Sequence, residues 1–314
     1  MIQEVDRMMI DYLARVKKYE DEVEHYSMDK YHYKWNGLQA LNYQEYQNIF
    51  TNVIDSQQIS FMKYARKKYM NQHHVFKEIF YLYAIETGRI EYVYDIDDNI
   101  SVQAHLQQVS CLSFNCNLIV EFNSQQLPLL FTLDYLKRVH AKHIQYAPFT
   151  SQYIPELQAQ IRTLIPSGRF KLEPNSPTRK DGKLFQFCPP SQVEQQLKLL
   201  FSLYEKYAQE NIYPVVLAAW FHAEFIRIHP FVDGNGRVGR FLSSKILIDN
   251  DLLPFIVEKR KKSEYIDCMD ESIAQNNLTS LVNFIKREQY SLIEYVRKQT
   301  MCEKPKYLTC SLDD

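Results

Sequence analysis

Apolar residues recur at helical spacing along most of the chain. Side chains three and four positions apart share one face of an α-helix, so this spacing indicates amphipathic helices. In the first 75 residues it is carried by Val5, Met8, Met9, Tyr12, Leu13 and Val16. The same pattern runs from about Phe76 to Glu91, and again over residues 132–165. We therefore expect helices in all three stretches.

The most apolar helical stretch runs from Pro214 to about Ile228 and opens with the uninterrupted apolar run 215–221. Proline suits the first turn of a helix, where its missing N–H costs nothing. A helix that is apolar on every side belongs in the core rather than on the surface. This stretch therefore predicts the central core helix. A capping box beginning at Ser191 predicts a helix before it, and a further apolar helix is expected from Phe241.

Residues 166–190 differ from the rest of the chain because they gather prolines and glycines. Within them, Asp181-Gly182 lies between two short alternating segments, which predicts a β-hairpin from Thr178 to Phe187. The whole chain of 314 residues has only seven glycines, far fewer than a protein with many tight turns needs. We therefore expect an all-α protein with one small hairpin.

The composition is that of an ordinary globular protein, with 46% hydrophobic and 24% charged residues. The length allows one large domain or two small ones. The 37 Lys and Arg residues are balanced by 38 Asp and Glu, which leaves a net charge of −1. This balance disfavours a protein built around binding to nucleic acid or to an acidic membrane.

The cysteines and the N-terminus indicate the compartment. The six cysteines contain no CxxC pair, which favours free thiols in a reducing compartment over a zinc site or a disulfide framework. Glu4, Asp6 and Arg7 lie where a signal peptide would need an apolar core. No apolar run is long and pure enough to cross a bilayer. We therefore expect a cytoplasmic protein that has no membrane partner.

Three of the seven glycines fall within the stretch from His229 to Arg240, which reads His-Pro-Phe-Val-Asp-Gly-Asn-Gly-Arg-Val-Gly-Arg. The stretch follows the predicted core helix and leads into the next helix. Backbone N–H groups at a helix N-terminus have no intrahelical partner, and glycines let an anion approach them closely. The pattern therefore predicts an anion-binding loop.

Polar side chains around this loop suit a metal-bound polyphosphate. Arg237 and Arg240 are three positions apart and share a helix face, where two guanidinium groups can bind phosphates. Asp233 offers a hard oxygen ligand for Mg²⁺. His229, with an ordinary pKa of about 6.5, can accept a proton near neutral pH. Phe231 is expected to anchor the loop in the core.

The stretch from His229 to Arg240 resembles the signature of the Fic family, HPFx(D/E)GNGRxxR, and meets every fixed position. A weaker resemblance covers roughly residues 76–290 and leaves residues 1–75 uncovered. The resemblance implies an all-α Fic helical core with a small β-hairpin flap. The expected organisation is an N-terminal helical region, an inhibitory helix with a connecting segment, the Fic domain core and a C-terminal tail, over residues 1–75, 76–130, 131–295 and 296–314.

Membership of this family implies a nucleotidyltransferase that moves AMP from Mg-ATP to a Ser, Thr or Tyr hydroxyl of a target protein. His229 would be the general base, and Asp233 would hold Mg²⁺. The phosphates would be cradled by Gly234, Asn235 and Gly236. Arg237 would contact the β-phosphate and Arg240 the γ-phosphate, and pyrophosphate would leave.

The family often carries an inhibitory motif, (S/T)xxxE(G/N), which Thr87 and Glu91 match. Tyr92 departs from the pattern, since glycine or asparagine is expected there. The alternative register, around Glu86, places Leu82 where the hydroxyl is expected, so Glu91 is preferred. The resemblance implies that Glu91 pairs with the second arginine of the signature and keeps it from the γ-phosphate.

The resemblance also places a flap before the core helices. Such a flap could register an extended target segment by main-chain pairing. The residues that fit it are Thr178, Arg179, Lys180, Asp181, Gly182, Lys183 and Leu184.

Several alternatives remain open from the sequence. The same residues could serve the reverse reaction, a deAMPylase that removes AMP from a modified protein with Glu91 positioning a water. A different donor such as UTP, or phosphorylation, is a further option. A catalytically silent helical scaffold that uses residues 1–75 is the rival from another class. A nucleotide and a target protein are the expected partners, with self-modification and a homodimer left open. His140 and His143 receive no role.

Overall fold

The computed structural model describes residues 33–69, 73–91, 131–145, 147–154, 158–175, 182 and 184–301. Within these residues the protein is helical, apart from one two-stranded antiparallel sheet. The predicted class, all-α with a small hairpin, is confirmed, although this hairpin precedes the one predicted from Thr178 to Phe187, part of which lies outside the described residues. The helices are α2 (Tyr43–Asn52), α3 (Ser56–Tyr69), α4 (His73–Ile90), α7 (Leu133–Ile144), α8 (Val193–Gln209), α9 (Pro214–Ile228), α10 (Asn235–Asp249), α11 (Lys262–Gln275) and α12 (Thr279–Met301).

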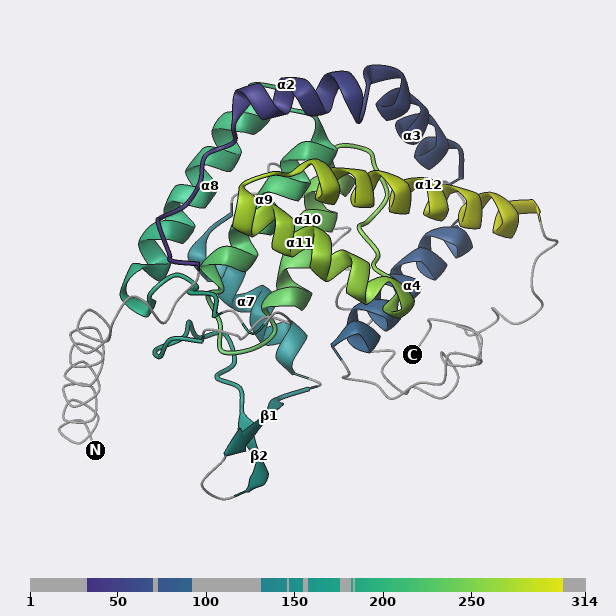
Figure 1. Ribbon diagram of the computed structural model, residues 1–314. Helices are drawn as coiled ribbons and strands as arrows, with labels where there is room; N and C mark the ends of the chain where they lie inside the picture. The colour runs from purple at the N-terminus through teal and green to yellow at the C-terminus, as the bar shows by residue number, and fades with distance from the viewer. Residues whose placement is uncertain are drawn as a thin grey trace.

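Helices α9 and α10 lie at the centre and the other helices surround them (Figure 1). Every residue of α9 is buried except Ile226, as the all-apolar pattern of this stretch predicts. Phe221 at its middle stacks on Phe131, with ring centroids 4.8 Å apart. The predicted core helix is confirmed, and Pro214 is its first residue. Because α9 is fixed on all sides, the loop that follows Ile228 starts from a rigid point.

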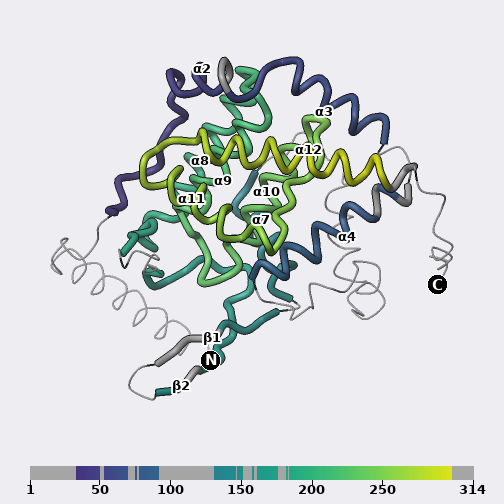
Figure 2. Tube along the Cα trace, turned by 45° about the vertical axis from the view of Figure 1, so that its right-hand side comes forward, coloured from purple at the N-terminus to yellow at the C-terminus, as the bar shows by residue number. Residues whose placement is uncertain are grey.

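The hairpin consists of β1 (Phe149–Ile154) and β2 (Ala159–Leu164), with Phe149 opposite Leu164. It projects away from the helices in both Figure 1 and Figure 2. The prediction of a helix over residues 132–165 is therefore right for α7 and wrong beyond it. Pro148 and Pro155 would interrupt a helix in this stretch.

Two predicted helix starts are displaced. The helix expected from the capping box begins at Val193, after a 3-10 turn over Pro190–Gln192, and no side chain caps it. Helix α10 begins at Asn235 rather than at Phe241. Its first turn is built from the polar and glycine residues of the signature, which an apolar pattern does not reveal. The arginines of the signature are therefore already in the helix.

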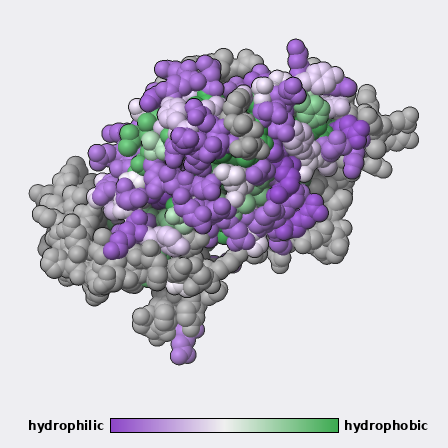
Figure 3. Space-filling view, turned by 45° about the horizontal axis from the view of Figure 1, so that its top comes forward, coloured by the Kyte–Doolittle hydropathy of each residue, from purple (hydrophilic) through white to green (hydrophobic). Residues whose placement is uncertain are grey.

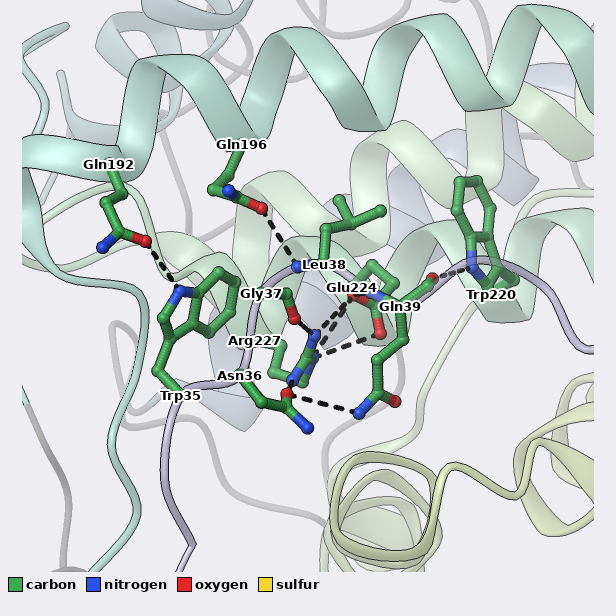
Figure 4. A network of polar contacts seen from close by, with 10 residues as sticks. All are labelled: Trp35, Asn36, Gly37, Leu38, Gln39, Gln192, Gln196, Trp220, Glu224 and Arg227. Atoms are coloured by element: carbon green, nitrogen blue, oxygen red, sulfur yellow. Dashed lines mark hydrogen bonds and ion pairs between the residues drawn. The ribbon is translucent and has the colours of Figure 1, made fainter.

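Residues 33–41, called here the N-terminal strap, lie along α8 and α9 (Figure 4). Side chains of both helices bind the strap's backbone. Gln196 accepts from the N–H of Leu38 at 3.0 Å, and Trp220 Nε1 donates to Gln39 O at 2.9 Å. Farther along, the N–H of Leu41 donates to the hydroxyl of Tyr207. The strap is therefore attached to the core helix although it has no regular structure of its own.

A buried ion pair of α9 joins the strap to the core. Arg227 and Glu224 are 3.2 Å apart at their closest nitrogen and oxygen, and both are nearly inaccessible to solvent. Arg227 also donates to Asn36 Oδ1 at 2.8 Å and to Gly37 O, and it lies over the Trp35 ring. Figure 4 shows these contacts converging on one guanidinium. Burying two charges is favourable only when such extra hydrogen bonds satisfy them.

The face shown in Figure 3 carries mostly hydrophilic side chains, with small hydrophobic patches between them. In the part of the chain that the structure describes, no helix combines the length and the apolar character needed to cross a bilayer.

Candidate active site

The loop between α9 and α10 is held in one shape by its own residues. His229 ends α9 with left-handed backbone angles, φ 49° and ψ 60°, and its N–H donates to Phe225 O at 3.0 Å. Asn235 bridges the loop, since its side chain accepts from the N–H of Phe231 and donates to Phe231 O. The Phe231 ring is fully buried, as expected for an anchor. The turn that presents His229 is therefore fixed at both ends.

The imidazole of His229 is oriented for proton acceptance. Its Nδ1 lies 3.1 Å from Ile226 O, and because a carbonyl can only accept, Nδ1 carries the hydrogen and Nε2 keeps the lone pair. The ring stacks flat on Phe187, with centroids 3.9 Å apart. Burial and then the nearby Lys171 ammonium hold the pKa of His229 below its usual value. The side chain is therefore a neutral base at neutral pH.

The N-terminus of α10 is shaped by two glycines. Gly234 is the N-cap with φ 80°, a conformation that favours glycine, and a Cβ there would overlap Ile144. At Gly236 a Cβ would overlap the carboxylate of Glu91. The first turn of a helix carries unpaired N–H groups and the positive end of the helix dipole. This end of α10 therefore already has a carboxylate lying against it.

Glu91 and Arg240 form the contact expected from the inhibitory motif. Glu91 Oε1 is 2.7 Å from Arg240 Nη2. Thr87 accepts from the same guanidinium twice, with its hydroxyl at 3.0 Å and its carbonyl at 3.2 Å. Arg240 is 2% exposed and Glu91 32% exposed. Arg240 is thus fully engaged by the end of α4.

The charges of this pair stabilise each other. Burial acts to raise the pKa of Glu91, but the Arg240 guanidinium outweighs it, so the pKa of this carboxyl lies below its usual value. Glu86, the glutamate of the alternative register of the motif, does not pair with Arg240. Glu86 instead pairs with Arg89 at 2.5 Å and accepts from the backbone N–H of Lys259. The preference for Glu91 over Glu86 thus agrees with the geometry.

Asp233 and Arg237 lie beside the same helix end. Asp233 Oδ1 accepts from the N–H of Gly234, and its side chain is 39% exposed. Arg237 Nη2 is 3.8 Å from that carboxylate, while Nη1 donates to His143 O at 3.2 Å. Within the described residues, no cluster of three or more His, Cys, Asp or Glu side chains could hold a metal by itself. Mg²⁺ commonly binds one or two carboxylates plus phosphates and water, so a single exposed carboxylate fits it.

His140, to which sequence analysis assigned no role, supports the loop from α7. Its Nε2 donates to Asp233 O at 3.0 Å, its Nδ1 accepts from the N–H of Gly168, and its ring stacks on Phe231 at 3.7 Å. Burial lowers the pKa of His140 to about 4, so it stays neutral. Its place on the apolar stripe of α7 was visible in the sequence, but its partners, distant along the chain, were not.

The proposed flap is described only in part. Thr178, Arg179, Lys180, Asp181 and Lys183 lie outside the described residues. The other two predicted residues are described: Gly182, with φ 77°, and Leu184.

The described end of the flap pairs with the N-terminal strap. The backbone N–H of Tyr33 donates to Leu184 O at 3.4 Å, and the backbone carbonyl of Tyr33 accepts from the N–H of Gln186 at 2.9 Å. Target docking by the flap stays a prediction.

Comparisons with known proteins agree with this geometry. Residues 131–247 match the family model described as Fic/DOC family. A protein of Drosophila persimilis, named Protein adenylyltransferase Fic, is 36% identical over 137 residues, which cover 41% of this chain and 25% of that protein. The chain thus spans about a quarter of the length of the curated relatives it matches.

Two solved structures share the fold. A Fic domain containing signaling protein from Bacteroides thetaiotaomicron has a TM-score of 0.51 and 19% identity, over 84% of this chain and 98% of that one. Fic-1 from C. elegans has a TM-score of 0.55 and 18% identity, over 79% of this chain and 72% of that one. At such identities the likeness shows the fold alone. The family match thus concerns residues 131–247, which contain the complete signature.

Proposed function

We propose that this chain is a protein adenylyltransferase that moves AMP from Mg-ATP to a Ser, Thr or Tyr hydroxyl of a target protein. The observation that carries the proposal is the joint placement of a neutral base and an anion-binding helix end in one loop. His229 ends α9, and the N-terminus of α10, six residues later, already lies against the Glu91 carboxylate. The name of the Drosophila relatives supports the same activity.

The transfer needs one proton acceptor and several donors to phosphate. His229 Nε2 takes the proton of the target hydroxyl, and the hydroxyl oxygen attacks the α-phosphorus of ATP. The bond between that phosphorus and the oxygen bridging to the β-phosphate breaks, and pyrophosphate leaves with the bonding electrons. Little covalent chemistry is asked of the protein, so positioning and charge stabilisation supply most of the rate.

The phosphate contacts follow from the helix end. Backbone N–H groups of Gly234, Asn235 and Gly236 cradle the phosphates, Arg237 contacts the β-phosphate, and Arg240 binds the γ-phosphate. Asp233 would hold Mg²⁺, which when bound neutralises charge on the phosphates and the departing pyrophosphate. The exposure of the Asp233 carboxylate supports this role.

The resting protein is autoinhibited by Glu91. Its carboxylate pairs with Arg240 and lies against Gly236, so it takes both a guanidinium and cradle space that the triphosphate needs. A γ-phosphate must displace this pair before Arg240 can bind it. At about 1.4 kcal/mol per decade, a competition of this kind changes activity by roughly one to two decades.

The flap residues Thr178 to Leu184 dock the target as an extended segment. Support comes from the described end of the flap, where the backbone of Leu184 and Gln186 pairs with Tyr33. In this region the backbone pairs with an extended segment of the chain itself, which is the kind of contact that β-strand addition uses.

Labelled ATP tests the proposal. ATP carrying the label on the α-phosphate should label protein in a lysate when mixed with Glu91→Gly, and ATP labelled on the γ-phosphate should not. Adding His229→Ala to Glu91→Gly should abolish the label, and undiminished labelling would end the proposal. Faster release of AMP from a pre-modified target than transfer to it would instead favour the deAMPylase. Failure of both wild type and Glu91→Gly to bind Mg-ATP in calorimetry would favour a silent scaffold.

A further inference from the structure

Three hydrogen bonds from residues 171–175 hold the turn around His229. Nζ of Lys171 donates to Ile228 O at 3.3 Å, and the backbone N–H of the same lysine donates to Pro230 O at 2.8 Å. Nδ2 of Asn175 donates to Phe231 O at 2.8 Å. The carbonyls on both sides of His229 are therefore bound by one short segment.

The two side chains of this segment are also joined to each other. Lys171 Nζ donates to Asn175 Oδ1 at 2.8 Å. The amide of Asn175 thus accepts from the lysine and donates to the loop, so the two residues act as one unit.

The backbone of His229 needs such support. A left-handed conformation costs a non-glycine residue roughly 1–2 kcal/mol, and it persists where the surroundings fix it. With φ at 49°, His229 has this conformation without being a glycine. If Ile228 O and Pro230 O were released, the turn could relax and the imidazole would leave its place.

Lys171 brings a charge as well as donors. It is 2% exposed, and both acceptors of its ammonium are uncharged groups of the described residues. Burying a charge without a carboxylate partner is costly, although a cation at the C-terminal carbonyls of a helix recovers part of the cost. In its charged form this lysine therefore has an electrostatic role at the turn as well as a hydrogen-bonding one.

That role concerns the neighbouring imidazole. The Lys171 ammonium lies 5.8 Å from the centroid of the Phe187 ring, which stacks on His229. Burial lowers the pKa of Lys171 to about 7, so this lysine is partly neutral at pH 7 and fully charged only in more acidic solution. Among the described residues, Cys188 is a further titratable group that faces Lys171; burial raises its pKa to about 12, so it is a neutral thiol.

We propose that Lys171 and Asn175 are positioning residues for the general base of the transfer reaction. They fix the turn that presents His229, and the Lys171 ammonium adds to burial in opposing protonation of the imidazole in acidic solution. This inference rests on the proposed function, but the placement and charge of His229 can be measured without any transfer.

The test compares two variants with the parent Glu91→Gly protein. Lys171→Gln keeps a donor but removes the charge, and Asn175→Ala removes the link to Phe231 O. The ring signals of His229 are followed by NMR during an acid titration and assigned by their loss in a His229→Gln protein. Transfer kinetics give kcat and the KM for ATP separately. Lys137→Gln is the matched control, because Lys137 is a half-exposed lysine that lies over Phe170 outside the turn.

In Lys171→Gln we expect the His229 ring to titrate about one pH unit higher, since a nearby positive charge is lost. We expect kcat to fall about tenfold in Lys171→Gln and in Asn175→Ala, with the KM for ATP within about twofold, because only the base is displaced. Lys137→Gln should match the parent.

The inference is overturned if the His229 titration in Lys171→Gln and kcat in both variants equal those of the parent. If Lys171→Gln does not fold, Asn175→Ala, which keeps the ammonium, decides through kcat. If no protein transfers AMP, including the parent, the proposed function fails, and the ring titration of Lys171→Gln alone decides the positioning role.

Discussion

The carboxylate of Glu91 lies in the space that a side chain at Gly236 would occupy. The same oxygen that pairs with Arg240 thus covers the first turn of α10. One carboxylate therefore contacts both a guanidinium and a helix end. Because Arg240 holds the pKa of Glu91 below its usual value, this ion pair persists throughout the neutral range and is lost only as the pH falls through that lowered pKa.

Glu91→Gln should relieve the proposed inhibition of AMP transfer, because the amide keeps the shape of the side chain but not the charge that pairs with Arg240. We expect AMP transfer to rise by about tenfold. Glu86→Gln is the matched control, since Glu86 is on the same helix but pairs with Arg89 and the backbone of Lys259. Initial rates of protein labelling measure both. Equal rates for the two variants would mean that the charge of Glu91 does not inhibit.

Gly236→Ala should impair nucleotide binding rather than activate the protein. The added Cβ would push Glu91 away, but it would also stand in the phosphate cradle. In a Glu91→Gly background, where no carboxylate competes, we expect the affinity for Mg-ATP to fall by about tenfold or more. Calorimetry checks this, and unchanged affinity would place the phosphates elsewhere.

Mild acid should destabilise the protein through its buried histidines. His140, His143 and His222 are at most 2% exposed, and burial lowers their pKa values to about 4, 3 and 3. The unfolded chain therefore binds protons below pH about 6.5 that the folded chain does not, at about 1.4 kcal/mol per histidine and pH unit.

Stability from these histidines is full above pH 6.5 and is lost as the pH falls toward 4. Urea unfolding at pH 7.0 and 5.5 measures the loss. Burial also raises the pKa values of Glu45 and Glu224, which works in the opposite direction nearer pH 4.5. An unfolding free energy that stays level between pH 7.0 and 5.5 would contradict the neutral state of the histidines.

Arg227→Met should strongly destabilise the fold, because it leaves Glu224 buried without its cationic partner and removes the contacts of Arg227 with the N-terminal strap. We expect a loss of about 3–5 kcal/mol at pH 7, and part of it should return in the double variant Glu224→Leu/Arg227→Met. Glu224 can take up a proton in the single variant, so the loss should be smaller at pH 5. Urea unfolding of wild type, Glu224→Leu, Arg227→Met and the double variant tests this, and additive effects would show that the pair is not coupled.

The signature residues and Glu91 were predictable from the sequence because their spacing is local. The glycines and arginines of the loop lie within two helical turns of each other, and Thr87 and Glu91 are four positions apart. The contact of Thr87 and Glu91 with Arg240 of α10 was expected from the family pattern, because no spacing in the sequence indicates it. The residues that support the loop gave no such signal, because His140, Lys171 and Asn175 reach it from 93, 57 and 56 positions away.

Periodicity failed where one element gives way to another. The apolar stripe correctly predicted α7. The predicted helix, however, was extended past Pro148 into residues that form the hairpin. At α10 the first turn consists of residues with little apolar character, so the pattern detected the helix only from Phe241, although Asn235 begins it. Hydrophobic spacing indicates which residues are buried. It does not indicate where a helix begins when its first turn consists of polar and glycine residues, as in α10.

The strap and α4 bear on how small a working fragment of this protein can be. The family match starts at residue 131, yet the charge on Arg227 is satisfied by Asn36 and Gly37, far upstream. A fragment trimmed to the matched region would leave that arginine short of acceptors and would also lack Glu91. Such a fragment should be poorly folded. Where it does fold, its AMP transfer would lack the proposed inhibition by Glu91.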